Sequence, residues 1–257
     1  MDELSFNKLK EVNMSTVTLH SLTKIPLVKE GDKIAQLIVE SASSDGVTID
    51  EGDLIVLAQK IVSKAEGATV KLSDVTASSE AVELAEKTGR DARLCQLYLD
   101  EASEVIAVKG RMVITRHKLG YVGSSSGIDR SNIAPHSEEI MVLLPKDPDA
   151  SARKIRAELK VLTGKTVGII INDSCGRDYR DGSVGMAIGV GGVDALRIDE
   201  KVDLFGNPST SRIAVVDEIA AAASLLMGQA NEGVPAVVVK GVTYTISEDA
   251  TIQDFIH

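Results

Sequence analysis

The chain has 257 residues, of which 44% are hydrophobic and 26% are charged, and its net charge at pH 7 is -10. These fractions are typical of a folded globular protein, and the acidic balance argues against non-specific binding to nucleic acid or to anionic membranes, since both need basic surface. No apolar run is long enough to span a membrane, the N-terminus is unlike a signal peptide, and the two cysteines form no disulfide framework. We therefore expect a cytoplasmic protein with reduced thiols.

Helical and strand-like apolar patterns alternate along the chain, which predicts an α/β or α+β sheet protein. In the first part of the chain the expected elements are a β-rich segment at 16–22, a helix at 33–42 capped by Asp32, a strand at 53–58 and a polar segment at 59–67. Two helices within 79–104, broken at Gly89, strands at 105–108 and 112–116, and a Gly/Ser-rich loop at 120–132 are expected next. The last part is expected to form a helix at 149–163, a strand that stops at Asn172, a helix at 215–227 and a strand at 235–241. Residues 1–15 carry no such pattern and are interpreted as an N-terminal extension to a domain at 16–257. Composition does not locate a boundary between lobes within that domain.

Polar and charged side chains come directly after the buried run Val167–Ile171. Ligands of open α/β sheets bind beyond the carboxyl ends of strands, where backbone groups and helix N-termini converge. Asp173 and Ser174 supply the hard oxygen ligands that Mg²⁺ or Mn²⁺ prefers. Arg177 and Arg180 could hold an anion beside them. A turn capped by Asp173 with solvated ion pairs explains the same residues, so both interpretations stay open.

Three further polar segments have the chemistry of a metal and phosphate site. Asp129 in the Gly/Ser-rich loop could share a cation with a second carboxylate, although a simple turn aspartate explains it equally well. Gln59 and Lys64 come after another strand end, where a lysine can meet phosphate as a point charge or can merely face solvent. The segment 228–234 could cradle phosphate with its backbone N–H groups while Gln229 reaches a metal, or it could simply end a helix.

Several familiar signals are missing from the sequence. There is no G-x-x-x-x-G-K-[ST] motif, and the glycines of 188–197 lack the dinucleotide-binding spacing. The chain is therefore predicted to be neither a P-loop protein nor a Rossmann enzyme. No serine nucleophile elbow is present, and the mid-chain histidines have no metal-ligand spacing. By elimination, the four polar segments predict a metal and phosphate site.

Seven motifs succeed one another between Lys24 and Gly241: KIPLVKEGD, IVSKAEG, GIDRSN, LLPKDPDASA, LTGKTVGIIINDSCGRDYRDGSVGMAIGVGGV, DLFGNP and VDEIAAAASLLMGQANEGVPAVVVKG. Together they resemble the coenzyme F420 gamma-glutamyl ligase family, whose members use GTP and divalent metal to join L-glutamate to the tail of a deazaflavin cofactor. The resemblance implies a GTP-dependent ligase that adds glutamate to F420-0, and to F420-1, through an acyl phosphate. It also implies an unusual mixed α/β fold of two intertwined lobes that pairs as a homodimer.

The resemblance assigns roles to residues that match the family's motifs. The metal positions, for two Mg²⁺ or Mn²⁺ ions with K⁺ as a further cation, fall on Asp129, Asp173, Ser174 and Gln229, of which Ser174 stands where Thr is common. The nucleotide positions fall on Lys24, Ile25, Pro26, Leu27, Gln59, Lys64, Asn132, Met227, Gly228, Gln229, Ala230, Asn231, Glu232, Gly233 and Val234. A role for Arg177 and Arg180 in holding a substrate carboxylate comes from guanidinium chemistry alone.

Two stretches bear on the identity of the substrate. The loop reads GSSSGID where relatives usually carry Asn-Ala before the glycine, so Ser125 and Ser126 are expected to alter contacts to the acceptor or to glutamate. The GSVGMAIG stretch resembles the stand-alone archaeal type. A folate or other pterin-like acceptor with the same chemistry is the alternative, and a non-catalytic nucleotide or metal sensor on the same fold is a rival of another class.

Overall fold

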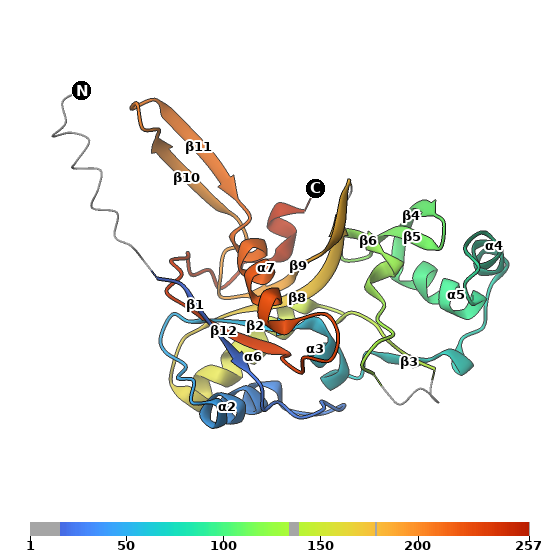
Figure 1. Cartoon of the computed structure of the whole chain (residues 1–257), viewed down its shortest axis with the longest axis horizontal. Helices are drawn as coiled ribbons and strands as arrows, with labels where there is room; N and C mark the ends of the chain where they lie inside the picture. Colours follow the sequence, from blue (N-terminus) through green and yellow to red (C-terminus); the bar gives the residue numbers. More distant parts are fainter. Residues whose placement is uncertain (1–15, 134–138, 178, 257) are drawn as a thin grey trace.

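The centre of the molecule is a mixed sheet of five strands in the order β1-β12-β2-β8-β9 (Figure 1). The structure, a computed structural model, describes residues 16–133, 139–177 and 179–256, so the expected extension at 1–15 lies outside it. The strands of the sheet are β1 (Thr18–Leu22), β2 (Leu54–Ala58), β8 (Gly168–Arg177), β9 (Arg180–Gly191) and β12 (Ala236–Lys240). β2 and β8 run parallel, whereas the other neighbouring pairs are antiparallel. The fold is therefore mixed α/β, as predicted.

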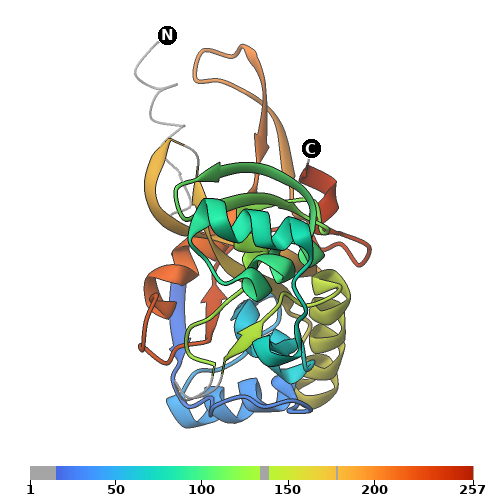
Figure 2. The same cartoon turned by 90° about the vertical axis from the view of Figure 1, so that its right-hand side faces the viewer.

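Helices cover both faces of this sheet (Figures 1 and 2). α2 (Ile34–Asp45) and α6 (Pro148–Thr163) pack on one face and α7 (Val215–Met227) packs on the other. Along β2, Ile55 belongs to the core under α2 and α6, and Val56 belongs to the core under α7. This double burial explains why the central strands read as continuous apolar runs rather than alternating ones.

A smaller lobe lies beside the sheet and has its own hydrophobic core, which includes Leu94, Tyr98 and Val113 (Figure 1). Its elements are β3 (Thr69–Lys71), the 3-10 helix η1 (Leu72–Asp74), α4 (Ser79–Thr88), α5 (Ala92–Glu101), β4 (Ala102–Lys109), β5 (Met112–His117), β6 (Val122–Ser124), η2 (Ser125–Gly127) and β7 (Ile140–Val142). β4, β5 and β6 form one sheet, and β3 pairs with β7 in another. Composition could not locate a division into lobes; in the structure the smaller lobe consists of the described residues at 69–133 and 139–142.

Two strands that the sequence analysis did not predict form a long hairpin, β10 (Arg197–Val202) and β11 (Pro208–Ile213). Figures 1 and 2 show this hairpin, called the arm below, projecting away from the body of the molecule. In its turn, Leu204 and Phe205 are 76% and 79% exposed to solvent. The arm thus presents apolar side chains to solvent. After β12 the chain ends in a short 3-10 helix, η3 (Ile252–Phe255).

The first correction concerns the start of α2. The sequence predicted Asp32 as the N-cap, but the cap residue is Lys33, which makes no side-chain capping bond. The Asp32 carboxylate instead accepts a hydrogen bond from the backbone N–H of Lys29 at 2.8 Å. Asp32 therefore closes the turn at Gly31, whose φ of 84° favours glycine, rather than capping the helix.

Two further corrections concern the carboxyl ends of the buried strands. The polar segment after β2 is a helix, α3 (Gln59–Ala65), which continues directly from the strand and buries Ile61 and Val62. β8 does not stop at Asn172 but continues to Arg177, paired with β9 across a bulge. The apolar run ends at Asn172, but the strand continues with polar side chains because its pairing depends on hydrogen bonds with β9. No helix among the residues that the structure describes is long and apolar enough to cross a membrane.

Candidate active site

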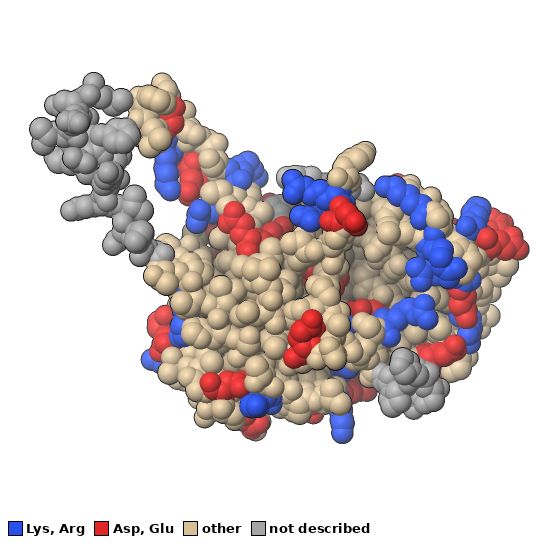
Figure 3. All heavy atoms as spheres, viewed as in Figure 1, with Lys and Arg blue, Asp and Glu red and all other residues tan. Residues whose placement is uncertain are grey.

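The topology brings three segments to one edge of the central sheet. β2 and β8 are parallel, so their carboxyl ends coincide, with Ala58 opposite Asn172. β12 runs the other way and starts at the same edge, where the Ala58 N–H donates to the carbonyl of Pro235 at 2.9 Å. The start of α3, the outer half of β8 and the loop at 227–235 therefore lie together. Figure 3 shows the surface hollowed where the body of the molecule meets the smaller lobe.

The smaller lobe adds a fourth segment, residues 129–132, which α3 holds through three side chains. The Gln59 Nε2 group donates to Asp129 Oδ2 at 2.8 Å, and the Lys60 ammonium lies 3.2 Å from the same oxygen. One turn later, the Lys64 ammonium donates to the backbone carbonyl of Asn132 at 2.7 Å. Gln59 and Lys64 are thus joined directly to Asp129 and Asn132, which lie far from them in the sequence.

The outer half of β8 presents its side chains to two opposite sides, as a strand must. Asp173 faces the smaller lobe, and the pKa of its carboxyl is raised to about 7, first by burial and then by the negative charge of Asp129. Ser174 points the other way, and its hydroxyl accepts a hydrogen bond from Gln229 Nε2 at 2.9 Å. Two of the residues predicted to bind metal, Asp129 and Asp173, therefore lie on one side of β8, and the other two, Ser174 and Gln229, lie on its opposite side.

The loop at 227–235 closes the cluster. The Asn132 side-chain amide donates to the carbonyl of Ala230, which ties this loop to the smaller lobe. Within the loop the Glu232 carboxylate accepts a hydrogen bond from the backbone N–H of Ala230 at 2.8 Å. Gly228 has a φ of 69°, and a Cβ there would clash with the Glu232 side chain. The predicted phosphate loop is thus a compact turn that depends on a glycine.

Two sets of predicted residues are not drawn into the cluster. Arg177 and Arg180 face each other at the exposed tip of the β8–β9 hairpin, about 13 Å along the strand from Asp173. In the segment Lys24–Leu27, the Lys24 N–H donates to Ser41 Oγ, and Leu27 is 87% exposed. Among the described residues no hydrogen bond or ion pair joins either set to the carboxylates. Their predicted roles gain no support from the folded chain.

The oxygen donors of the cluster fit a hard divalent cation. Two carboxylates, a hydroxyl and an amide oxygen come from Asp129, Asp173, Ser174 and Gln229, and none of them is a soft ligand. Like-charge repulsion between the two carboxylates is a cost that a cation would remove. Within residues 16–133, 139–177 and 179–256, no group of three or more His, Cys, Asp or Glu side chains could hold a metal ion. A metal ion held by the carboxylates of Asp129 and Asp173 would therefore need further ligands, and phosphate oxygens commonly provide them for Mg²⁺.

Of the two serines expected to alter contacts to the substrates, Ser126 lies in the interior of the smaller lobe. Its side chain is buried, donates to the carbonyl of Tyr98 at 2.8 Å and bonds to Thr115 Oγ at 3.0 Å. The backbone φ of 51° turns the chain at this position. Ser126 therefore holds the loop onto the core of the smaller lobe rather than facing a ligand.

Sequence reasoning missed two residues of the cluster. Lys60 was passed over in favour of Lys64, although both lie one turn apart on α3. Asn172 was treated as the end of a strand, yet its buried amide donates to Ser224 Oγ at 3.1 Å and its Oδ1 atom has no partner within the described residues. Lys60 follows the end of the apolar strand by two residues, and this closeness to the sheet edge is the signal that could have identified it.

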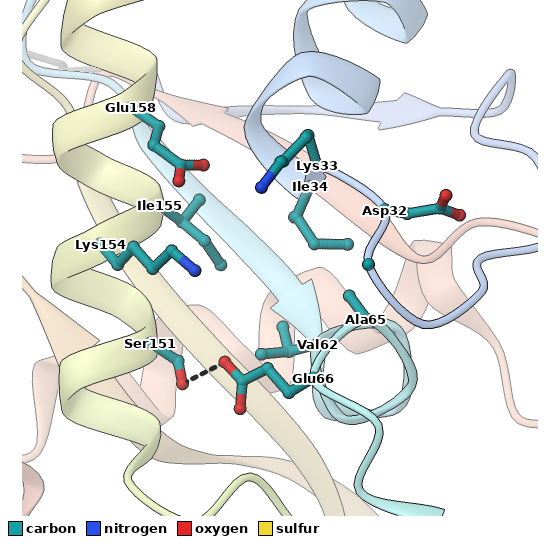
Figure 4. Close-up of a pocket in the computed structure, with 11 residues that line it drawn as sticks. Asp32, Lys33, Ile34, Val62, Ala65, Glu66, Ser151, Lys154, Ile155 and Glu158 are labelled. Carbon is teal, nitrogen blue, oxygen red and sulfur yellow. Dashed lines mark hydrogen bonds between the residues drawn. The ribbon is translucent and has the colours of Figure 1, made fainter.

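A separate cavity lies between α2, α3 and α6, at the other end of α3 (Figure 4). Ser151 donates to the carboxylate of Glu66 there at 2.6 Å, and Lys154 and Glu158 line the same wall. None of the predicted site residues lines this cavity. It is therefore distinct from the cluster at the sheet edge.

Comparison with known proteins identifies the family of the chain. The family model described as F420-0:Gamma-glutamyl ligase matches residues 23–241. The coenzyme F420:L-glutamate ligase of Methanothermobacter thermautotrophicus is 43% identical over 228 residues, which cover 88% of this chain and 89% of that protein. The proteins of the same name from Methanocaldococcus jannaschii and Archaeoglobus fulgidus are 44% and 42% identical, each over 85% of both chains. The chain therefore belongs to the F420-0:gamma-glutamyl ligase family.

Proposed function

We propose that this chain is a GTP-dependent ligase that joins the amine of L-glutamate to a carboxylate of coenzyme F420-0, and in a second round to F420-1. The names of the relatives support the acceptor and the amino acid. The observation that carries the proposal is the convergence of Asp129 and Asp173 at the shared end of two parallel strands. A pair of carboxylates beside lysines is what a metal-bound triphosphate requires.

The proposed reaction has two steps. The acceptor carboxylate attacks the γ-phosphorus of GTP, the bond from that phosphorus to the β–γ bridging oxygen breaks, and GDP leaves an acyl phosphate behind. The glutamate amine then attacks the acyl carbon, phosphate departs, and the nitrogen loses a proton to solvent. The product is an amide one glutamyl residue longer.

The chain's own residues hold the reactants. Asp129, Asp173, Ser174 and Gln229 would hold two Mg²⁺ or Mn²⁺ ions, which supply charge that neutralises the phosphates as the bond breaks. Lys64 would hold a phosphate oxygen when its ammonium leaves the carbonyl of Asn132, and the loop at 228–234 would hold others when its N–H groups leave the carboxylate of Glu232. The tight turn at Gly228 keeps those N–H groups close together. The arginines at the hairpin tip are left without a role in this scheme.

The test is an incubation of the protein with GTP, Mn²⁺ and L-glutamate, with F420-0 in one reaction and folate-type acceptors in others. We expect a product with the mass of one or two added glutamyl residues from F420-0, and phosphate release that requires both acceptor and glutamate. Product from a folate alone would assign the acceptor to the pterin class. Nucleotide binding with no product from any acceptor would identify a sensor rather than an enzyme.

We further propose that the protein acts in the cytoplasm as a homodimer. Support for the dimer comes from the arm, whose turn carries exposed apolar side chains at Leu204 and Phe205 on a hairpin that contacts little of its own chain (Figure 1). Apolar surface of this kind is typically buried against a partner.

A further inference from the structure

The carboxylate of Asp129 is already paired with a cation of the chain itself. The Lys60 ammonium lies 3.2 Å from Asp129 Oδ2 and donates to Ser131 Oγ at 3.1 Å. Both partners of this pair are mostly buried, with side chains 22% and 30% exposed. The oxygen assigned above to a divalent metal is therefore held by an ammonium group in the free chain.

We propose that Lys60 is a positioning residue that makes metal binding and nucleotide binding depend on each other. In the free chain its ammonium neutralises Asp129 and competes with a divalent cation for the carboxylate. When a nucleotide binds, the ammonium moves to a phosphate oxygen, and Asp129 is released to the metal. This inference rests on the proposed function, because it assumes that the cluster binds a metal and a nucleotide.

Charge favours this exchange. A dication and an ammonium cannot both sit against one carboxylate oxygen without strong mutual repulsion, and the repulsion is larger in a site partly removed from water. Bound phosphates bring new negative charge, so the cluster can then accept both cations. A lysine is suited to this movement because its charge sits at the end of a flexible four-carbon chain.

The arrangement on α3 supports the same exchange. Lys60 and Lys64 lie one turn apart on the helix and both reach towards residues 129–132. Burial and the nearby charge of Lys60 lower the pKa of Lys64, so the two ammonium groups lie close enough to repel each other. Two neighbouring ammonium groups beside a glycine-rich turn create a positive potential that favours the binding of an anion.

Lys64 provides a matched control. It belongs to the same helix and has the same charge, but its ammonium donates to a backbone carbonyl, that of Asn132, rather than to a carboxylate. Replacing Lys64 removes a phosphate partner without freeing Asp129. Replacing Lys60 does both.

The experiment measures Mn²⁺ binding by electron paramagnetic resonance and GDP binding by calorimetry, each with and without the other ligand. GDP is used because it cannot be turned over. We expect Lys60→Met to bind Mn²⁺ alone about fivefold more tightly than the wild type, since a competing ion pair is removed, and to bind GDP more weakly. The factor by which GDP improves Mn²⁺ binding should shrink, and by linkage so should the factor by which Mn²⁺ improves GDP binding. Lys64→Met should weaken GDP binding and should tighten Mn²⁺ binding alone by much less than Lys60→Met does, because Lys64 acts on Asp129 only through its charge and does not pair with it.

Opposite changes in the two affinities are the signature, because a merely structural role would weaken both. Lys60→Gln, which keeps a polar group for Ser131, serves as a second variant, and thermal unfolding checks that each variant folds. The inference is overturned if Lys60→Met binds Mn²⁺ no more tightly than the wild type, or if GDP does not improve Mn²⁺ binding to the wild type. If the wild type binds neither Mn²⁺ nor GDP, the proposed function itself fails.

Discussion

Among single residues, Asp173 combines a small structural contribution with the largest electrostatic cost in the cluster. Its carboxylate accepts a hydrogen bond from the backbone N–H of Ser174 at 2.8 Å, which an amide oxygen could also accept. Burial and the charge of Asp129 both disfavour its ionised form. A carboxylate at a position that disfavours its ionised form indicates that the site uses its negative charge.

The first prediction is that Asp173→Asn abolishes turnover without unfolding the protein. We expect kcat to fall by roughly a hundredfold or more, because a charge that neutralises metal and phosphate is lost. The melting temperature of the metal-free protein should stay the same or rise, since the amide avoids the cost of a buried charge. Unchanged turnover at saturating substrates would reduce Asp173 to a turn residue.

Ser126 gives the second prediction, in which stability changes and substrate binding does not. Ser126→Ala removes the hydrogen bonds of the hydroxyl to the Tyr98 carbonyl and to Thr115 Oγ, although the N–H groups of Ala102 and residue 126 still bond to these two oxygens. The free energy of unfolding should therefore fall by about 0.5–1.5 kcal/mol. Urea unfolding measures this loss, and KM values for the substrates should not move. Ser125→Ala is the matched control, because Ser125 has a similar φ of 58° and its side chain makes no hydrogen bond within the described residues. A raised KM with unchanged stability would restore the substrate role that the sequence suggested.

At the level of elements, β9 is notable because it forms an edge of the central sheet and yet is well covered. Buried carboxylates from two helices accept hydrogen bonds from its backbone: Asp149 from Val190 at 2.7 Å and Asp217 from Ala187 at 2.9 Å. An exposed edge strand invites pairing with other chains, and these carboxylates occupy the free N–H groups. Both side chains lie in the first turns of helices, where a negative charge is favoured.

The third prediction comes from the pKa of Asp217, which burial raises above its ordinary value. A raised pKa in the folded state means that this group's contribution to stability is present at low pH and is lost as the pH rises through the folded pKa. Asn keeps the accepting oxygen and has no proton to lose. The stability of Asp217→Asn relative to wild type should therefore increase as the pH rises from about 4, the usual value for Asp.

Urea unfolding at a series of pH values measures this difference. Asp217→Ala is the control, because it removes the acceptor for the Ala187 N–H and should destabilise the protein at every pH, by about 1–3 kcal/mol. A stability difference between Asp217→Asn and wild type that does not vary with pH would contradict the prediction.

The fourth prediction concerns the glycines of β9 and their role in packing. A Cβ at Gly189 would lie 2.5 Å from the Pro148 Cβ and 2.6 Å from its carbonyl carbon, so the glycine lets α6 approach the strand closely. Gly189→Ala should lower the free energy of unfolding by about 1–3 kcal/mol through overpacking. Gly176→Ala on the paired strand meets nothing within 4 Å and should be nearly neutral. Equal effects of the two substitutions on the unfolding midpoint would contradict this packing.

For the whole molecule, the sequence predicted the parts that obey local rules. The buried runs and amphipathic helices, such as α7 (Val215–Met227), lie where periodicity placed them. The pairing of Ala58 with Asn172 could also be anticipated, because strands that run parallel end at the same edge. The short helix α3 was missed because seven residues are too few to show a helical period. The position of Arg177 could not be foreseen, because the pairing that extends β8 depends on a partner strand and not on its own composition.

The fifth prediction is that the protein sediments as a dimer at micromolar concentration and that the arm is required for this. Phe205→Ser should shift the protein towards the monomer, because an exposed aromatic side chain is lost from the turn. Val161→Ser on α6 is the matched control, since Val161 is 85% exposed but lies away from the arm. A wild-type protein that sediments as a monomer would contradict the proposed dimer.

The order of the central sheet also governs how the protein can be synthesised. β12 (Ala236–Lys240) is the last strand made, yet it lies between β1 and β2, which are made early. While the ribosome is still translating, the neighbours of β12 have a vacant position between them, and the fully buried side chains of Leu54–Leu57 lack one of their partners. The sheet can close only after residues 236–240 have emerged. Nascent chains of this protein are therefore expected to depend on chaperones until β12 has been made, because until then they hold apolar strands with unpaired edges.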